Sequence, residues 1–213
     1  PTRRSSDLLG MASDYLPWQE MAERAESIHR LNAVNSEVAF KRVKEFLIFL
    51  ERKIKYFDEP LPESVRKRML EARFIPLLRK PRNFPLKWKT EEYENDALLA
   101  PKDVFAEDEK YLLCCAEPLI GVFVSRDVKE LLKLNKKHAT LDHVIWQLKQ
   151  ALSSNVASLD SSAIEEINAV CKAVYSYLQN AISRNGAAVE KLLKDKTFIL
   201  CGRDRKSTRL NSS

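Results

Sequence analysis

Three prolines in the middle of the chain constrain its fold more than any other feature. They lie within the segment FIPLLRKPRNFPLKWK, residues 74–89. Because proline lacks a backbone N–H and clashes with the preceding helical turn, a regular helix cannot run through this segment and a central strand is disfavoured. We therefore expect short extended pieces here, held in place by Phe74, Phe84 and Trp88.

Helical patterns precede this segment. WQEMAERAESIHR, from Trp18 to Arg30, is typical of a short polar helix, and Asn35 or Ser36 can cap the next one. The apolar residues of that second helix recur at helical spacing: Phe40, Val43, Leu47, Leu50 and Ile54. The short connection between the two helices predicts an antiparallel pair. After the proline-rich stretch at 60–62, ESVRKRMLEA predicts a third helix.

Helices are also predicted after residue 125. Ser125 or Asp127 can cap VKELLKL, and Thr140 can cap LDHVIWQLKQAL. Ser162 and Glu165 form a capping-box pair for the longest helix, and Gly186 is a candidate for its C-terminal cap. Between the two helical regions, LLAPKDVF predicts a turn into a helical start, and YLLCCAEPLI predicts a strand or a buried run.

These patterns give an order of segments along the chain. We expect a helical pair at 9–58, a mixed helix and strand segment at 59–125, and a helical segment at 126–203 that ends in a truncated strand. That strand, from Thr197 to Cys201, is expected to lack a partner. The predicted fold class is α+β, predominantly α-helical with a short extended or strand-rich middle segment.

The two ends of the chain are expected to be foreign to it. DRKSTRLNSS, residues 204–213, matches the translation of a common short-read sequencing adapter, and PTRRSSDL, residues 1–8, resembles the opposing adapter in translation. We therefore expect residues 9–203 to be an internal fragment of a larger protein and leave the tails out of fold arguments. Native disordered arms of the same Ser and Arg composition are the alternative.

Glycine and cysteine usage argues against common cofactor sites. The four glycines are scattered, whereas loops that cradle phosphates need clustered glycines. Cys114 and Cys115 are adjacent, and Cys171 and Cys201 are isolated, so none forms a CxxC or a metal-ligand pair; buried, reduced thiols are expected. No stretch reaches the ~20 apolar residues of a membrane span. We expect no cofactor and no membrane span.

The sequence offers no convincing catalytic group. His138 and His143 are five residues apart, which is not the spacing that lets two imidazoles share a metal on one helix face. The carboxylates of TEEYEND, residues 90–96, lie in a polar loop that offers little burial to raise a pKa. No GxSxG motif supports a hydrolase. We therefore expect that the chain is not an enzyme.

One candidate surface combines cations with aromatic side chains. Arg79, Lys80 and Arg82 stand close to Phe84 and Trp88, a mixture that can neutralise phosphates and stack bases, or can bind a protein. A solvated basic face with structural aromatics is the alternative. The formal charge of the chain is +6, of which +1 and +2 come from the two tails, so residues 9–203 carry only about +3. So small a net charge gives little support for binding nucleic acid. We expect a protein-interaction surface here and no nucleic-acid partner.

The order of several sequence blocks resembles a known family. FIPLLRKPRNFPLKWK is followed by LLAPKDVF, CCAEPLI, VKELLKL, HATLDHVIWQLKQAL, CKAVYSYLQ and KTFILCG, within residues 66–202. This series, in this order and at this spacing, resembles the repeat region of the sacsin family of giant cytoplasmic co-chaperones. One departure is Leu134-Asn135, which stands where the family pattern has Leu-Gly.

The resemblance implies an internal section of a cytoplasmic co-chaperone scaffold. In that family, each repeat joins a module with the gyrase and heat-shock type ATPase fold to a further α+β region, and this chain is similar to the latter. The implied function is protein folding and quality control, with heat-shock chaperones as partners. No catalytic residue is carried over. The alternative is an accessory part of a chaperone-type ATPase whose nucleotide site lies outside this chain.

Overall fold

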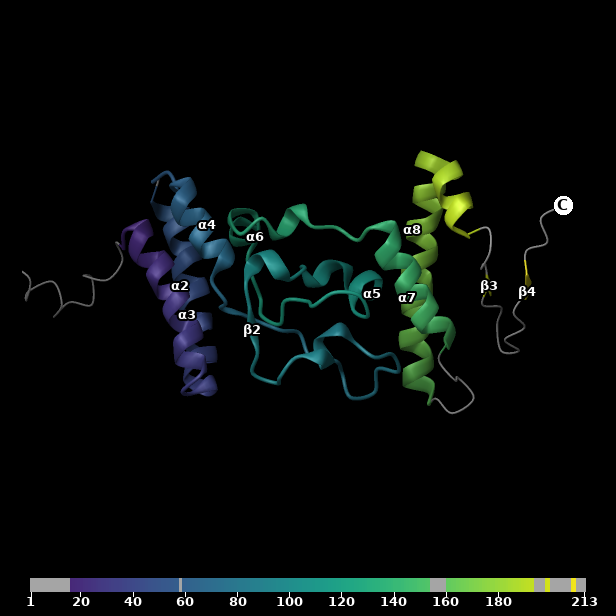
Figure 1. The fold of residues 1–213 in the computed structure, drawn as a ribbon, viewed down its shortest axis with the longest axis horizontal. Coiled ribbons are helices and arrows are strands. Elements are labelled where there is room, and N and C mark those ends of the chain that lie inside the picture. Colours follow the sequence, from purple (N-terminus) through teal and green to yellow (C-terminus); the bar gives the residue numbers. More distant parts are fainter. Residues whose placement is uncertain (1–15, 58, 154–159, 194–197, 200–207, 210–213) are drawn as a thin grey trace, which may run out of the picture. The chain divides into compact units, whose positions relative to one another are not determined.

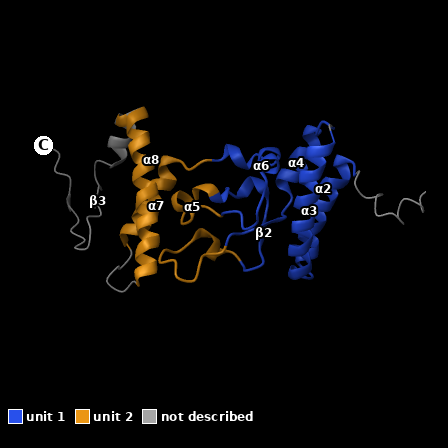
Figure 2. Cartoon of the chain, turned by 180° about the vertical axis from the view of Figure 1, so that it is seen from behind, with its two compact units in different colours: residues 1–78, 94–107, 119–137 blue, residues 79–93, 108–118, 138–213 orange. Residues whose placement is uncertain are grey.

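The chain forms two compact units, coloured blue and orange in Figure 2. The computed structural model describes residues 16–57, 59–153, 160–193, 198–199 and 208–209. Among these, unit 1 lies within residues 1–78, 94–107 and 119–137, and unit 2 within residues 79–93, 108–118 and 138–213. The helical pair predicted at 9–58 belongs to unit 1. The two later predicted segments, 59–125 and 126–203, each contribute to both units.

Three helices form one part of unit 1. α2 (Trp18–Asn32) and α3 (Ser36–Tyr56) pack side by side, and α4 (Glu63–Glu71) packs against α2 (Figure 1). α3 begins after Asn35, whose side-chain oxygen accepts a hydrogen bond from the Val38 N–H at 3.0 Å. Apolar residues at helical spacing supply the core: Met21, Ala25, Ile28, Val43, Phe46 and Leu50. The predicted pair and the predicted third helix are confirmed.

The first part of the proline-rich segment forms short extended pieces in unit 1, as predicted. β1 (Ile75–Pro76) pairs with β2 (Leu98–Leu99) in a two-residue antiparallel ladder. Phe74 is fully buried, and its ring centroid lies 5.2 Å from that of Phe46 in an edge-to-face contact. Isolated bridges extend this framework, joining Leu77 to Ile120 and Phe105 to Leu119.

Two residues hold the loops of unit 1 around this ladder. The Gly121 N–H donates to the Pro76 carbonyl at 2.7 Å, and a Cβ on Gly121 would lie 2.3 Å from the backbone C and O atoms of Leu77. Only glycine permits this close approach. Lys137 Nζ donates to three carbonyls around the short 3₁₀ helix η2 (Pro101–Asp103): those of Pro101 and Val104, each at 3.0 Å, and that of Lys102.

α6 (Arg126–Leu131) is followed within unit 1 by a left-handed residue, Lys133. Ser125 stands at the N-cap of α6 without a side-chain capping hydrogen bond, and the alternative, Asp127, lies within the first turn, so the predicted side-chain cap is wrong. Lys133 has a φ of 56°, a conformation that glycine adopts most easily. A 3₁₀ turn follows it, η4 (Leu134–Lys136). The left-handed position therefore precedes Leu134-Asn135, the point at which the sequence departs from the family pattern.

Unit 2 is built on the helices α7 (Leu141–Ser153) and α8 (Ser161–Leu193), and the short helix α5 (Lys110–Leu113) packs against both. Thr140 Oγ1 accepts from the His143 N–H at 3.4 Å, which fits its predicted capping role. Apolar residues recur along α8 at three- and four-residue steps; the central ones are buried, and Ile164 and Ile182 at the two ends are exposed. The buried members are Ile167, Cys171, Val174 and Leu178.

Both predicted caps of the C-terminal helix are wrong. α8 begins at Ser161, and Asp160 Oδ1 accepts the Ala163 N–H at 2.8 Å, so Asp160 does the capping in place of the predicted Ser162–Glu165 box. Gly186 does not end the helix, which continues to Leu193. The sequence VEKLLKD therefore begins inside α8 and does not start a separate helix. The two alanines that follow Gly186 are strong helix formers, and they favour continuation.

Two strand predictions also need correction. YLLCCAEPLI begins as helix α5, whose first turn is closed by the Cys114 N–H bonding the Lys110 carbonyl at 2.9 Å; within it, only Leu119 and Ile120 make β-bridges. The strand predicted at 197–201 is described as β3 (Phe198–Ile199), and it pairs antiparallel with β4 (Thr208–Arg209). Residues 197, 200 and 201 lie outside the described part of the chain. For residues 198–199 the expectation of an unpaired strand is wrong, although the pairing strand β4 lies within the tail expected to be foreign.

The predicted fold class is confirmed. The described chain is predominantly helical, and its strands form only two-residue antiparallel ladders. In the part of the chain that the structure describes, no helix is both long enough and apolar enough to cross a bilayer.

Candidate interaction surface

The aromatic side chains of the predicted surface are buried within unit 2. Phe84 is 4% exposed and Trp88 is 2% exposed. Their ring centroids lie 5.1 Å apart at an interplanar angle of 77°, an edge-to-face pair. A turn closed by the Phe84 N–H and the Pro81 carbonyl at 3.0 Å precedes the pair, and the Lys89 N–H bonds the Cys114 carbonyl at 2.7 Å. Phe84 and Trp88 therefore anchor this loop.

Two of the three predicted cations are engaged inside the same unit. Arg79 Nη1 donates to the carbonyls of Thr90 at 2.9 Å and Tyr93 at 3.3 Å. Lys80 Nζ lies 2.9 Å from Glu91 Oε1. Burial alone would raise the pKa of the Glu91 carboxyl, but hydrogen bonds from Lys80 and from the Trp88 N–H outweigh it and hold that pKa below its ordinary value.

Arg82 is the predicted site residue that stays exposed. The neighbouring Lys87 is exposed as well. The five predicted residues are thus brought into one loop, but four of them are buried or engaged with their own unit. Its role as an interaction surface stays a prediction, with Arg82 and Lys87 as the groups still open to a partner.

The adjacent cysteines form a buried polar cluster with α7. Gln147, itself fully buried, donates from Nε2 to Cys114 Sγ at 3.0 Å and accepts the Cys115 N–H on Oε1 at 3.0 Å. The two sulfur atoms are 4.0 Å apart. Hydrogen bonding from Cys115 lowers the pKa of Cys114, and the same contact, together with burial, raises the pKa of Cys115. Burial keeps both thiols from reagents and fits a structural role.

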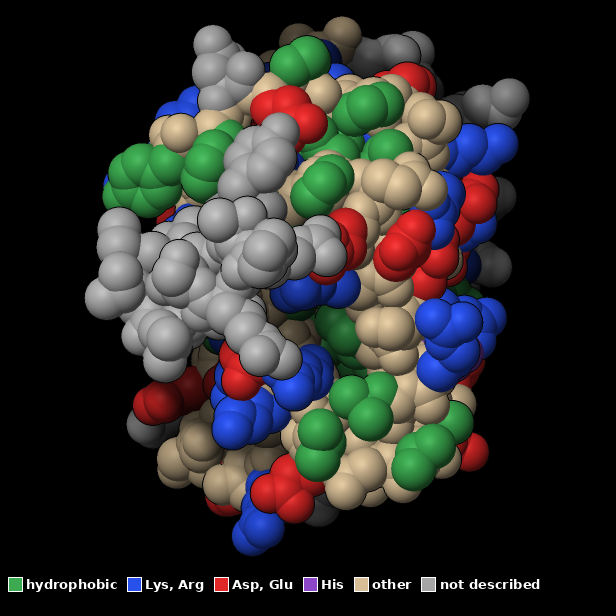
Figure 3. Space-filling view, turned by 90° about the vertical axis from the view of Figure 1, so that its left-hand side faces the viewer, with side chains coloured by type: hydrophobic (Ala, Val, Ile, Leu, Met, Phe, Trp, Pro, Cys, Tyr) green, Lys and Arg blue, Asp and Glu red, His purple; other side chains and the backbone are tan. Residues whose placement is uncertain are grey.

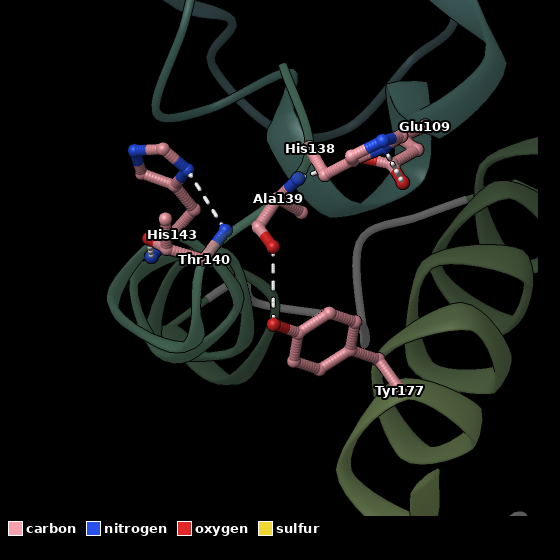
Figure 4. A network of polar contacts seen from close by, with 6 residues as sticks. All are labelled: Glu109, His138, Ala139, Thr140, His143 and Tyr177. Carbon is pink, nitrogen blue, oxygen red and sulfur yellow. Dashed lines mark hydrogen bonds and ion pairs between the residues drawn. The ribbon is translucent and has the colours of Figure 1, made fainter. Parts of the chain in front are cut away.

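The histidines join a polar network at the start of α7, shown in Figure 4. Glu109 accepts the Ala139 N–H on Oε2 at 2.6 Å, and its Oε1 lies 3.3 Å from His138 Nδ1. Tyr177 of α8 donates its hydroxyl to the Ala139 carbonyl at 3.0 Å, and burial raises the pKa of that hydroxyl. His143 Nε2 lies 3.2 Å from Glu117. These contacts tie the segment before α7 to its neighbours.

The network does not assemble a metal centre. His138 and His143 each face a different carboxylate, Glu109 and Glu117. Over the described ranges, no group of three or more His, Cys, Asp or Glu side chains is placed to hold a metal ion.

Exposed apolar side chains are mostly single, which is normal for a protein surface. On the face drawn in Figure 3, hydrophobic side chains are interspersed with Lys, Arg, Asp and Glu. Val34, just beyond the end of α2, is 86% exposed. Ile48 and Phe123 differ, because they line the same groove of unit 1 and are 53% and 81% exposed.

This groove, called the α3 groove below, has a volume of about 390 Å³. One wall is α3, with Lys44, Leu47, Ile48 and Glu51; the other wall is residues 121–125 with Val128 of α6. Leu47, Val124 and Val128 are buried and form an apolar lining beneath the exposed Ile48 and Phe123. The α3 groove can therefore hold a protruding apolar side chain.

A row of cations runs along the same face of α3. Lys44 and Arg52 stand four residues from Ile48, and Lys41 and Lys55 stand seven residues from it, so all four share its face of the helix. All four are exposed. Among the described residues, Lys41, Lys44 and Arg52 form no ion pair. This cationic row, defined by Lys41, Lys44, Arg52 and Lys55, borders the α3 groove.

Sequence reasoning missed the α3 groove. Ile48 is not part of the apolar stripe from which the buried face of α3 was predicted. The cations four and seven residues before and after it could have indicated that it lies on the exposed face. In Val122, Phe123 and Val124, half-buried, exposed and buried residues follow one another, as in an extended segment with one outer face. Neither signal shows that the two segments form one groove, because that depends on tertiary packing.

The fold and surface define a class of protein. It is a helix-dominated α+β segment that carries, in its described part, an apolar groove and a row of exposed cations. The ordered sequence blocks place it within that class as a sacsin-like segment, and comparison with known proteins confirms this resemblance.

The chain is 31% identical to Sacsin of Homo sapiens over 205 residues. The match covers 90% of this chain and 4% of that protein, so the chain spans a small fraction of the length of the relative it matches. No family model matches the chain. No solved structure matches it either.

Proposed function

We propose that the chain is a non-catalytic structural and protein-interaction section of a sacsin-like co-chaperone scaffold. It would act in the cytoplasm, in protein folding and quality control, together with heat-shock chaperones. The observation that carries this proposal is the 31% identity to human Sacsin over 90% of the chain. The chaperone role is what the resemblance to the sacsin family implies.

The contacts of potentially reactive groups support a non-catalytic role. Cys114 and Cys115 are buried around Gln147, and the half-buried His143 lies 3.2 Å from Glu117. His138 is exposed, and its Nδ1 lies 3.3 Å from Glu109, the carboxylate that also accepts the Ala139 N–H. A nucleophile or general base needs space beside it for a substrate atom within hydrogen-bonding reach. The two buried thiols lack that space and contribute to the packing of unit 2.

The surface of unit 1 supports a binding role. Ile48 and Phe123 expose apolar area on the two walls of the α3 groove, beside the cationic row. Apolar anchors surrounded by charged groups are the usual composition of a protein-binding site.

The proposal is tested by measuring chaperone binding and nucleotide turnover on the same purified chain. Immobilised chain is exposed to a purified ATP-driven heat-shock chaperone with its J-domain partner, and separately to heat-denatured luciferase. We expect saturable binding to at least one of them and ATP hydrolysis no faster than that of an unrelated helical protein of equal charge. Absence of binding to both, or ATP turnover by the chain itself, would contradict the proposal.

A variant of the full-length parent separates scaffolding from the alternative, an accessory part of a chaperone-type ATPase. Arg82→Ala with Lys87→Ala removes the exposed cations of the predicted loop and leaves the buried Trp88 in place. We expect the ATP turnover of the parent to be unchanged. A fall in turnover with the fold intact would favour the accessory role.

A further inference from the structure

We propose that the α3 groove binds an acidic amphipathic helix of a partner protein. The apolar side of that helix would enter the groove, and its carboxylates would face the cationic row. This inference rests on the proposed function and names the site and the partner chemistry that the function would use.

The apolar part of the site is already in place. Phe123 and Ile48 hold most of their side-chain surface in water, at 81% and 53% exposure, and they stand above the buried Leu47, Val124 and Val128. An apolar side chain inserted between them would remove that surface from water, at a gain of roughly 25 cal/mol per Å² before the costs of association. A volume of about 390 Å³ leaves room for such an anchor.

The charges identify the kind of partner. The cationic row runs from Lys41 to Lys55, and at a rise of about 1.5 Å per residue it extends for about 21 Å along α3. A helix lying beside α3 presents residues at the same three- and four-residue steps, so carboxylates on it can meet Lys44 and Arg52 in register while apolar residues between them meet Ile48.

The shape and the lining favour a protein over a membrane or a nucleic acid. Ile48 and Phe123 belong to two walls of a concave site, which a ridge on a helix fills and a flat bilayer surface does not. Glu51 also lines the groove. Its carboxylate would repel phosphates, whereas a partner helix can offer it a Lys or an Arg.

A labelled peptide tests the site directly. The probe is a fluorescein-labelled helix of about 18 residues, long enough to span the cationic row, with Leu at three- and four-residue steps and Glu at most other positions. A scrambled peptide of the same composition and a version with Lys in place of Glu are the comparisons. Fluorescence anisotropy should show the acidic helix binding at least about tenfold more tightly than either, with affinity falling as salt is added.

Variants of the chain locate the binding. We expect Phe123→Ala and Ile48→Ala each to weaken the acidic peptide by about tenfold, and Lys44→Glu with Arg52→Glu to abolish binding. Val34→Ala removes an exposed apolar side chain elsewhere in unit 1, and Lys67→Glu reverses an exposed cation on α4; both should bind as the unaltered chain does. All the changed residues are exposed, so circular dichroism should show the same fold throughout.

Several outcomes would overturn the inference. These are no binding of the acidic helix, equal binding of the scrambled or basic peptide, and equal binding by the groove variants and the controls. Binding to phosphatidylserine vesicles or single-stranded RNA in place of the peptide, lost in Lys44→Glu with Arg52→Glu, would assign the surface to a different partner and overturn it too. If the peptide fails while chaperone or luciferase binding persists, the proposed function stands and only this site is wrong.

Discussion

Two regions of this chain combine cations with large apolar side chains, and they use them differently. In the loop at residues 79–88, Trp88 and Phe84 are buried, and Arg79 and Lys80 are engaged with groups of their own unit. On the outer face of α3, Ile48 is exposed beside a cationic row in which most members form no ion pair among the described residues. The sequence favours the first region as an interaction surface, and the structure leaves the second one available.

The difference teaches that composition does not identify a surface by itself. A cation already bonded to a carbonyl or a carboxylate must lose that contact before it can bind a partner, and a buried ring offers no area. An exposed cation and an exposed ring lose only water. Matched substitutions in the two regions and in the residues that support them test this difference.

The largest expected effect is the loss of the buried indole in the loop. Trp88→Ala should lower the free energy of unfolding of unit 2 by about 3–5 kcal/mol, because it removes a fully packed ring and its contact with Phe84. Urea unfolding measures this. The matched change on the α3 groove, Phe123→Ala, should cost less than about 0.5 kcal/mol because that ring is exposed. Similar losses from the two variants would remove the distinction between the regions.

A smaller loss is expected from the glycine that lies between the ladder and the α3 groove. Gly121→Ala places a Cβ against the Leu77 backbone and should destabilise unit 1 by about 1–3 kcal/mol. Gly186→Ala is the control, since a Cβ there meets only an Ile182 methyl at 3.9 Å, and it should stabilise α8 by about 0.5–1 kcal/mol. Thermal unfolding of both variants tests the pair, and a neutral Gly121→Ala would show that the backbone is not held close.

The thiol cluster predicts an effect of similar or lesser size. Gln147→Leu leaves the buried Cys115 N–H without its acceptor, at a cost of about 1–3 kcal/mol in urea unfolding. It also removes a donor from Cys114 Sγ, so the pKa of that thiol should rise. Gln150→Leu on the same helix should change neither quantity. Unchanged stability in Gln147→Leu would mean that the amide is not a structural partner.

The smallest effect concerns an ion pair between α2 and α4. Arg68 donates to both carboxylate oxygens of Glu26 at 2.8 Å, and this hydrogen bonding lowers the pKa of Glu26 below its ordinary value of 4.5. The stabilisation is therefore complete above about pH 4.5 and is lost as the pH falls through the lower, folded-state pKa. Because both side chains are about a third exposed, solvent screening should keep this stabilisation small.

This pH dependence is measurable against a variant. Urea midpoints of the unaltered chain and of Arg68→Ala should differ at neutral pH and converge in acid, whereas Arg82→Ala should follow the unaltered chain at every pH. Parallel curves for the unaltered chain and Arg68→Ala would show that the pair adds no pH-dependent stability.

Local signals predicted much of the fold. The Asn35 cap, the apolar stripe of α3 and the prolines around Phe74 each act within a few residues, so their outcomes could be read from the sequence. The errors arose where a competing local partner won: Asp160 in place of Ser162 at the start of α8, and continued helix in place of a stop at Gly186.

The site was harder to predict because it depends on contacts between distant residues. The pairing of Lys80 with Glu91, and the burial of Cys115 against Gln147, are not visible in composition or spacing. The meeting of Ile48 with Phe123 across the α3 groove depends on which face of α3 packs against α6. The sequence shows which residues are cationic and which are apolar. Tertiary packing determines which of them remain exposed to a partner.

The most direct test of the central claim is a methyl and indole NMR footprint of the acidic helix on the isotope-labelled chain. The account predicts that the signals of Ile48, Val122 and Val124 shift on titration, while those of the Trp88 indole and the α8 core stay in place. Shifts centred on Trp88 and its loop, with the Ile48 methyl unchanged, would contradict it and return the interaction surface to residues 79–88.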